Sequence, residues 1–375
     1  MKKSKIDAPA GENEVTGPGR LTRRDLLRYG GTAGMALAVY VSGTNIHGQK
    51  KKTMKFMTVS HSVNTAVYAP HLVAKELGYF EENGLDATFV VPGGGARVAQ
   101  VLAGRQVGFA QGDSSHPLKI SEKGKPCAMI YGTDTRCSYA NIVVRKELFD
   151  AGLNTVEKLA TMPRKDGEPR VIAATRIGSG TWVYGNYVLE RHKANGKAVN
   201  DQVKWVGGGG SSTMLGGLKS GQFDAIMAVP IWMEKAVADG YGMPLFDISS
   251  ATAWKDVFGG DIPTTVGYAL RETIDDDPDV TDGYVKAVYQ AMQWLKGRNP
   301  DEVYDKIGKK YMGTFTKEQV TNEVKYYQAI FNYNLLVSKT DFENGKKVWV
   351  PKATKKDWGY DEVVDMRAVE KAMKG

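Results

Sequence analysis

Two short apolar runs separated by a helical pattern occupy residues 54–92. The first run holds Phe56, Met57 and Val59 and stops at Ser60, which is typical of a buried strand. The second run, 87–91, is β-branched and aromatic and ends at Pro92. Between them, apolar residues recur at helical spacing before the helix-stop pair Asn83-Gly84, at Ala69, Leu72, Val73, Leu77 and Phe80. The pattern predicts a strand, a helix and a parallel strand.

The loop between the first strand and its helix is polar. His61, Ser62, Asn64 and Thr65 follow the strand directly. In an open α/β sheet, ligands bind at this edge, beside the unpaired backbone N–H groups of the helix start. We therefore expect this loop to form the first wall of a binding site.

The same alternation continues along the chain. Strands are expected at 106–110, 128–131, 141–145, 171–175, 203–206, 223–229, 244–248 and 264–271. Helices are expected at 96–104, 118–124, 182–195, 213–221, 233–240, 280–297, 301–311 and 316–333, the last capped by Thr316. Further polar or Gly-rich strand-to-helix junctions fall at 111–117, 178–181, 207–212 and 230–232. The pattern indicates an α/β fold of two lobes.

The order of elements also predicts how the lobes are joined. The chain leaves the first lobe near 133–139 and returns near 249–263, which implies a two-segment hinge with a cleft between the lobes. The expected parts are a leader at 1–43, the first lobe at 54–138, the second lobe at 139–261, and the remainder of the first lobe with the C-terminal helices at 262–375.

The N-terminal segment has the pattern of an export signal. Arg23-Arg24 is followed by Leu26-Leu27 and by a soft, Gly-rich and Ala-rich apolar run at 29–42. This resembles a twin-arginine signal, which implies the twin-arginine export machinery as a partner and a periplasmic location. The alternative is a short buried helix, which the glycines disfavour. The run is also shorter than the roughly 20 residues of a membrane-spanning helix.

Charge and cysteine content narrow the function classes. The 375 residues carry a formal charge of +8, scattered after Lys52 without a dense basic run, so nucleic-acid binding is not expected. The two cysteines, Cys127 and Cys137, match no metal or redox motif. An extended segment between them would span about 33 Å, too far for a disulfide, although an oxidising compartment would permit one.

Several stretches resemble a type II periplasmic solute-binding protein of the nitrate, taurine and alkanesulfonate class, which also includes binders of thiamine-pyrimidine precursors. The resemblance covers residues 54–296 and is carried by 72–86 (LVAKELGYFEENGLD), 102–110 (LAGRQVGFA), the junction at Ser179, 218–225 (LKSGQFDA) and 229–232 (VPIW). It implies the type II periplasmic-binding-protein architecture and delivery of a small solute to the membrane permease of an ABC importer. It also implies ligand contacts at His61, Asn64, Thr65, Gly94, Gly95, Asp113, Ser114, Ser115, Ser179, Gly180, Thr181, Trp182, Ser211 and Trp232.

The residue types at these junctions favour a small anionic organic solute or nitrate. Helix starts and Ser or Thr hydroxyls can donate to sulfonate, carboxylate or nitrate oxygens. Each hydroxyl can equally be an ordinary helix cap. Asp113 argues against a simple anion if it lines the cleft, and then a ligand with a donor is implied. The rings of Trp182 and Trp232 can either stack on a flat ligand or pack in the hydrophobic core.

Alternative functions remain open at this stage. A pyrimidine-binding protein or a sensing module for a membrane receptor would share these features. Catalysis is not expected, because the chain has no Gly-x-Ser-x-Gly elbow and no obvious paired carboxylates, and the Cys-rich signature of pyrimidine-making relatives is absent. No cofactor is expected, since 207–210 lacks the Lys-Ser/Thr of a phosphate loop. No metal is expected, since the two cysteines lack the spacing of a metal site.

Overall fold

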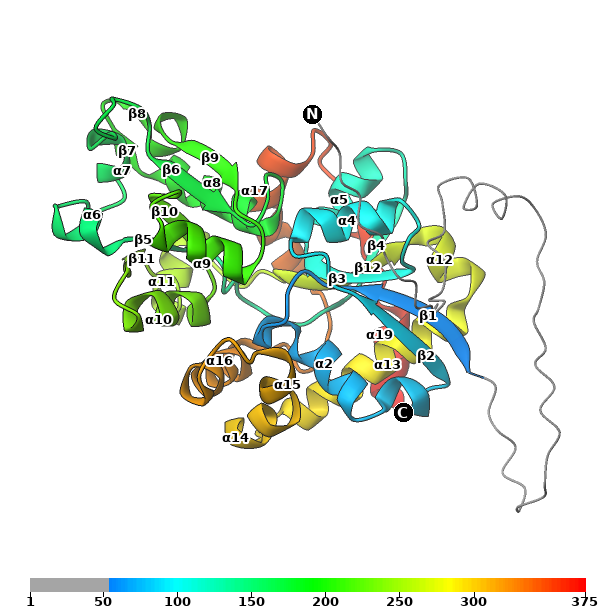
Figure 1. The fold of residues 1–375 in the computed structure, drawn as a ribbon. Coiled ribbons are helices and arrows are strands. Elements are labelled where there is room, and N and C mark those ends of the chain that lie inside the picture. The colour runs from blue at the N-terminus through cyan, green and yellow to red at the C-terminus, as the bar shows by residue number, and fades with distance from the viewer. Residues whose placement is uncertain (1–53) are drawn as a thin grey trace, which may run out of the picture. The chain divides into compact units, whose positions relative to one another are not determined.

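The computed structural model describes residues 54–375, apart from the side chains of Pro351 and Ala353. Two five-stranded sheets organise these residues (Figure 1). The predicted leader at 1–43 lies outside the described residues. No helix in the described part is long and apolar enough to cross a membrane.

The first sheet has the strand order β2-β1-β3-β12-β4. Its strands are β1 (Lys55–Ser60), β2 (Leu85–Val90), β3 (Phe109–Asp113), β4 (Cys127–Gly132) and β12 (Thr265–Leu270). β1 pairs in parallel with β2 and β3, whereas β12 runs antiparallel between β3 and β4. The helices between its first four strands are η1 (Ala66–Tyr68), α2 (Ala69–Glu76), α3 (Tyr79–Glu82), α4 (Gly95–Ala103) and α5 (Ser115–Glu122). We call this sheet and its helices the first lobe.

The second sheet has the order β11-β5-β10-β6-β9, with β5 antiparallel to both neighbours. Its strands are β5 (Asn141–Arg145), β6 (Val171–Ala174), β9 (Lys204–Gly207), β10 (Ala225–Ala228) and β11 (Gly242–Phe246), with a side hairpin of β7 (Lys193–Ala194) and β8 (Lys197–Ala198). Its helices are α6 (Lys146–Asp150), α7 (Lys158–Thr161), α8 (Gly180–Arg191), η2 (Val199–Gln202), α9 (Ser211–Lys219), α10 (Pro230–Ala238) and α11 (Ala251–Phe258). This is the second lobe, drawn in green in Figure 1.

The chain passes between the sheets twice, after β4 and after α11. The predicted fold of two α/β lobes joined by two segments is therefore confirmed. The proposed limits of the lobes, at 139 and 262, lie in these connections and stay predictions. Cys127 and Cys137 are both buried and free.

One prediction about local structure was wrong, and one helix was not predicted. The strand expected at 106–110 runs instead from Phe109 to Asp113, because β3 is paired on both sides and buries its polar end. There Gln111 donates to the hydroxyl of Thr133 at 3.2 Å. The return segment 249–263 contains α11, a helix that the sequence pattern did not predict, which buries Trp254 and Phe258 in the second lobe. The role of this segment as a hinge stays a prediction.

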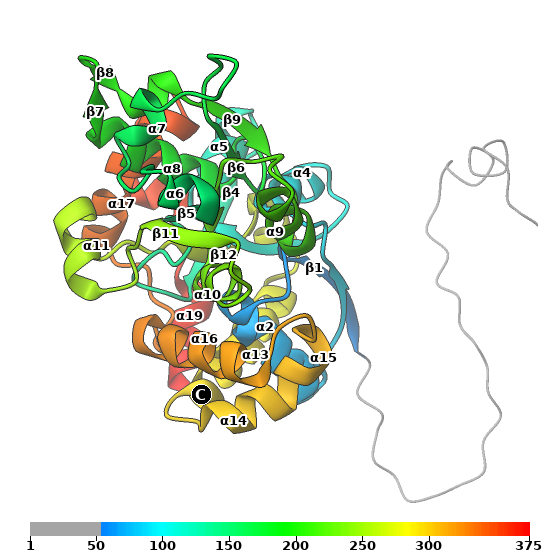
Figure 2. The same cartoon turned by 60° about the vertical axis from the view of Figure 1, so that its left-hand side comes forward.

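The C-terminal third is helical. It comprises α12 (Arg271–Asp276), α13 (Pro278–Leu295), α14 (Pro300–Val303), the π-helix η3 (Tyr304–Gly308), α15 (Lys309–Tyr311), α16 (Lys317–Ile330), α17 (Lys339–Ala353), α18 (Tyr360–Val363) and α19 (Arg367–Lys374). The predicted cap of α16 is confirmed, because Thr316 and Gln319 form a reciprocal capping box. α13 packs on α2 and α3 of the first lobe, and α16 packs on η1 and on α10 of the second (Figure 2).

α17 contacts both lobes, through α5 of the first and α8 of the second. Its buried Trp349 donates from Nε1 to the hydroxyl of Tyr184 on α8, at 3.1 Å. The same tyrosine packs against Trp254 and Phe258. A C-terminal helix thus anchors the helix that follows β6.

We expect Tyr184→Phe to lower the free energy of unfolding by about 1–3 kcal/mol, because it leaves a buried indole N–H without a partner. Denaturant titration measures the change. Tyr187→Phe is the matched control on the same helix, since its ring stacks on Phe258 and its hydroxyl has no hydrogen bond within residues 54–375. Equal effects of the two substitutions would contradict a role for the Trp349 hydrogen bond.

Candidate functional site

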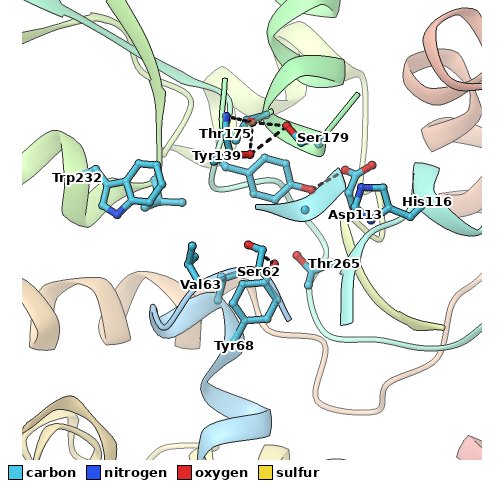
Figure 3. A pocket seen from close by; sticks show the side chains of 15 residues that line it. Ser62, Val63, Tyr68, Asp113, His116, Tyr139, Thr175, Ser179, Trp232 and Thr265 are labelled. Atoms are coloured by element: carbon cyan, nitrogen blue, oxygen red, sulfur yellow. Dashed lines mark hydrogen bonds between the residues drawn. The ribbon is translucent and has the colours of Figure 1, made fainter. Parts of the chain in front are cut away.

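A small cleft lies where residues from both lobes meet (Figure 3). The volume of this cavity is about 50 Å³. Its lining comes from the junctions after β1, β2, β3, β6 and β10, from the start of β12, and from the first connection between the lobes. The lining residues are Ser62, Val63, Val67, Tyr68, Gly95, Asp113, His116, Tyr139, Thr175, Ser179, Gly180, Thr181, Val229, Trp232 and Thr265.

Six of the fourteen predicted contacts line this cleft: Gly95, Asp113, Ser179, Gly180, Thr181 and Trp232. They come from four separate junctions, which the fold brings together because the carboxyl ends of the parallel strands face the same side. The remaining eight lie outside the lining: His61, Asn64, Thr65, Gly94, Ser114, Ser115, Trp182 and Ser211. As ligand contacts, all fourteen stay predictions.

The loop after β1 turns its first polar residues inward. His61 is buried, and its Nε2 lies 2.9 Å from Asn64 Oδ1. Its Nδ1 lies 3.3 Å from His71 Nδ1, and its ring stacks on Tyr68 at 4.8 Å between centroids. Burial lowers the pKa of His61 to about 4. His61 therefore packs against the Tyr68 ring and lies outside the lining, whereas Tyr68 lines the cleft.

Two serines outside the lining donate hydrogen bonds within the protein. The hydroxyl of Ser114 donates to the carbonyl of Pro263, and that of Ser115 donates to Asp113. Gly94 faces the side chain of Arg176, and a Cβ added there would lie 3.2 Å from Arg176 Nε. Trp182 is half-buried on α8, and Ser211 begins α9.

Four helices of the described part begin at the cleft without a side-chain cap. These are α4, α5, α8 and α10, whose N-cap residues make no capping hydrogen bond from their side chains. The interpretation of Ser114 and Ser179 as ordinary helix caps is therefore wrong. Instead, the hydroxyl of Ser179 donates to the carbonyl of Arg176 at 2.7 Å. Uncapped helix starts in a cleft are suited to bind polar ligand atoms.

Asp113 is the acidic residue of the lining. Its Oδ1 accepts a hydrogen bond from the backbone N–H of Ser115 at 3.0 Å, and its Oδ2 accepts one from the Tyr139 hydroxyl at 2.8 Å. A Cβ added at Gly180 would lie 2.5 Å from the same Oδ2. The carboxylate of the first lobe therefore lies directly on the start of α8 in the second lobe.

Comparison with known proteins identifies the chain. The model of the NMT1-like family matches residues 57–307, which is most of the chain. The chain belongs to the NMT1-like family. Among curated proteins, it is 19% identical over 288 residues to YtlA of Bacillus subtilis (strain 168), provisionally named as a binding protein. The match covers 76% of this chain and 79% of YtlA.

Solved structures share the fold of this NMT1-like chain. A protein of Bordetella bronchiseptica RB50 has a TM-score of 0.73 and 19% identity, over 85% of this chain and 97% of that one. The periplasmic nitrate-binding protein NrtA of Synechocystis PCC 6803 has a TM-score of 0.67 and 15% identity, over 86% and 89%. The chain therefore has the periplasmic-binding-protein fold. The desulfurization enzyme DSZB shares it at a TM-score of 0.58, with 15% identity over 85% and 99%, so the fold alone does not exclude catalysis.

Sequence reasoning missed several lining residues of the NMT1-like cleft. His116 follows the Asp113 junction, and its Nδ1 lies 3.0 Å from the Tyr268 hydroxyl. Burial lowers its pKa to about 4, so the ring is neutral near pH 7. Its position at the start of a helix that follows a strand was a usable signal. Thr265 had none, because only the pairing of β12 beside β3 places it opposite Asp113. Tyr139 had none either, because it lies in the connection between the lobes and reaches the cleft through its hydrogen bond to Asp113.

The described residues hold no cluster of three or more His, Cys, Asp or Glu side chains suited to a metal ion. The polar groups of the cleft are instead hydroxyls, one carboxylate, one imidazole and one indole. This set can hydrogen-bond a small organic molecule between apolar walls formed by Val63, Val67 and Val229.

Proposed function

We propose that this NMT1-like protein is an extracytoplasmic substrate-binding protein, which captures a small organic solute between its lobes and delivers it to an ABC importer. The observation that carries the proposal is the cleft, lined from both lobes and bordered by four helix starts whose N-cap residues make no capping hydrogen bond from their side chains. The names of the binding proteins YtlA and NrtA support it. Binding rather than catalysis is part of the proposal, as are export by the twin-arginine route and a periplasmic location.

Two ligand classes fit this function. A small anion, such as a sulfonate, a carboxylate or nitrate, is favoured by the helix starts at Gly95 and Gly180. A donor-bearing solute, for example a pyrimidine, is favoured by Asp113 and by the rings of Tyr68 and Trp232 in the lining. Both would enter when the lobes separate about the two connecting segments, and both would be enclosed when they close.

A thermal-shift screen tests the proposed function. The probes are nitrate, bicarbonate, alkane and aromatic sulfonates, aromatic carboxylates, and pyrimidines. A ligand at 100 times its Kd adds about 2.7 kcal/mol to the free energy of unfolding, which raises the Tm by several degrees. Small-angle scattering with a stabilising ligand should then show compaction. A ligand that stabilises the protein without compacting it would count against capture between the lobes.

Thr181→Ala is expected to weaken the binding of such a ligand by about fivefold to tenfold, because Thr181 lines the cleft and its hydroxyl orders the junction. Thr181 Oγ1 accepts a hydrogen bond from the backbone N–H of Thr175 at 3.0 Å. Trp182→Ala is the neighbouring control, since Trp182 lies outside the lining. Titration calorimetry measures both. A larger loss of affinity for Trp182→Ala would move the site to another face of α8.

A further inference from the structure

The carboxylate of Asp113 already lies at two of the helix starts that would attract an anion. Its Oδ1 accepts hydrogen bonds from the N–H and the hydroxyl of Ser115, the first residue of α5. Its Oδ2 lies against Gly180, the first residue of α8. A third helix, α10, begins with Pro230, which has no N–H to donate. Asp113 therefore places a negative charge at the starts of α5 and α8, where a ligand anion would otherwise be attracted.

The fifteen lining residues include no Lys and no Arg. The cation that acts on Asp113 is Lys119, whose Nζ lies outside the lining and donates to the carbonyl of Gly178 at 2.7 Å. Lys119 therefore presents its ammonium group to this carbonyl and not to the lining of the cleft. Arg176 also lies outside the lining, where its side chain packs on Gly94. A ligand anion in the cleft would be repelled by Asp113 at close range.

Three buried polar atoms of the lining have no hydrogen-bond partner within residues 54–375. They are His116 Nε2, Trp232 Nε1 and Thr265 Oγ1, on side chains at most 1% exposed. The indole N–H can only donate, so it needs an acceptor. Asp113 Oδ2 can accept more than the one hydrogen bond it receives from Tyr139. Figure 3 shows Trp232 and Asp113 at opposite ends of the pocket.

We infer that the solute carries no net negative charge, donates an N–H to Asp113 Oδ2, and offers an acceptor to Trp232 Nε1. Small organic amides and related neutral N–H compounds have this chemistry. His116 and Thr265 then supply further polar contacts near Asp113. The inference rests on the proposed function and narrows it, because it excludes simple anions from the cleft.

Matched amide and carboxylate pairs test this inference, because each pair differs in charge and in donor but hardly in shape. Titration calorimetry compares acetamide with acetate, benzamide with benzoate, and nicotinamide with nicotinate, and adds nitrate and methanesulfonate. At least one amide should bind the wild-type protein ten or more times more tightly than its carboxylate. Equilibrium dialysis against a small-molecule extract of bacterial cells, read by mass spectrometry, extends the test. There we expect a neutral N–H compound to be enriched.

Two variants assign the contacts. Asp113→Asn keeps the shape of the side chain. It should lower the affinity for the amide by tenfold or more and reduce the preference for the amide over the carboxylate. Trp232→Phe should lower the affinity for the amide by about fivefold to tenfold. Asp256→Asn on α11 is the control, since it removes the same charge from an exposed position. It should change neither affinity.

The outcomes separate this inference from the proposed function. Tighter binding of a carboxylate, nitrate or methanesulfonate, or enrichment of an anion from the extract, overturns the inference and leaves solute capture standing. Unchanged amide affinity in Asp113→Asn also overturns the inference alone. If no probe binds and nothing is enriched from the extract, the proposed function fails, and the inference fails with it.

Discussion

Gly180→Ala is expected to lower the affinity for the captured solute at least a hundredfold. A Cβ at this position would lie 2.5 Å from Asp113 Oδ2, 2.8 Å from its Cγ and 2.9 Å from its Cβ. The aspartate cannot simply rotate away, because Tyr139 and Ser115 hold both of its oxygens. The added methyl group should therefore force the lobes apart at the site where the ligand is enclosed.

Titration calorimetry with the solute found by screening measures the affinity, and small-angle scattering of the ligand-free protein measures the separation of the lobes. The overpacking should also lower the free energy of unfolding by about 1–3 kcal/mol. Gly216→Ala on α9 is the matched control, because an added Cβ there meets nothing within 4 Å. In that helix the substitution should stabilise the protein by up to about 1 kcal/mol. Wild-type affinity in Gly180→Ala would show that the ligand is not enclosed at this contact.

Glu323→Gln is expected to make the protein markedly more stable than the wild type at alkaline pH. Glu323 on α16 is 1% exposed. Its Oε2 accepts a hydrogen bond from the backbone N–H of Ala66 at 2.9 Å, whereas its Oε1 has no partner in the described part of the chain. Burial, together with the nearby Glu234, raises the pKa of this carboxyl from 4.5 to about 8. The folded protein therefore holds a proton that the unfolded chain releases.

The sign of the effect follows from this difference. Between the unfolded pKa of 4.5 and the folded pKa of about 8, the folded state binds more protons, so the wild type loses stability as the pH rises. Glutamine keeps the acceptor for Ala66 and does not titrate. The advantage of Glu323→Gln over the wild type should grow by about 4 kcal/mol between about pH 5 and about pH 8.5.

Urea denaturation at a series of pH values measures this growth. Comparing the variant with the wild type at each pH cancels the contributions of other buried groups, such as Asp134, whose pKa burial raises to about 7. Glu318→Gln is the control on the same helix, because Glu318 is exposed. Its difference from the wild type should stay constant over this pH range. A constant difference for Glu323→Gln as well would mean that Glu323 is ionised in the folded protein at neutral pH.

The linear sequence by itself determined the local elements and their order. Apolar spacing predicted α2 and α13, and the Thr316 pattern predicted the start of α16. The polar junctions after β6 and β10 predicted the lining residues Ser179, Gly180, Thr181 and Trp232. These features depend on residues a few positions apart, which the helical and strand periods relate directly. The two crossings between like halves were enough to predict two lobes.

Tertiary structure alone decided which of these residues face the cleft. β12 pairs between β3 and β4, more than a hundred residues away along the chain, and this pairing buries the polar end of β3 and brings Thr265 beside Asp113. It also decided that Asp113 lies at the starts of α5 and α8. Periodicity reports which face of an element is apolar, but it does not report which distant element packs on that face. The side chains that meet in the cleft are therefore set by long-range pairing.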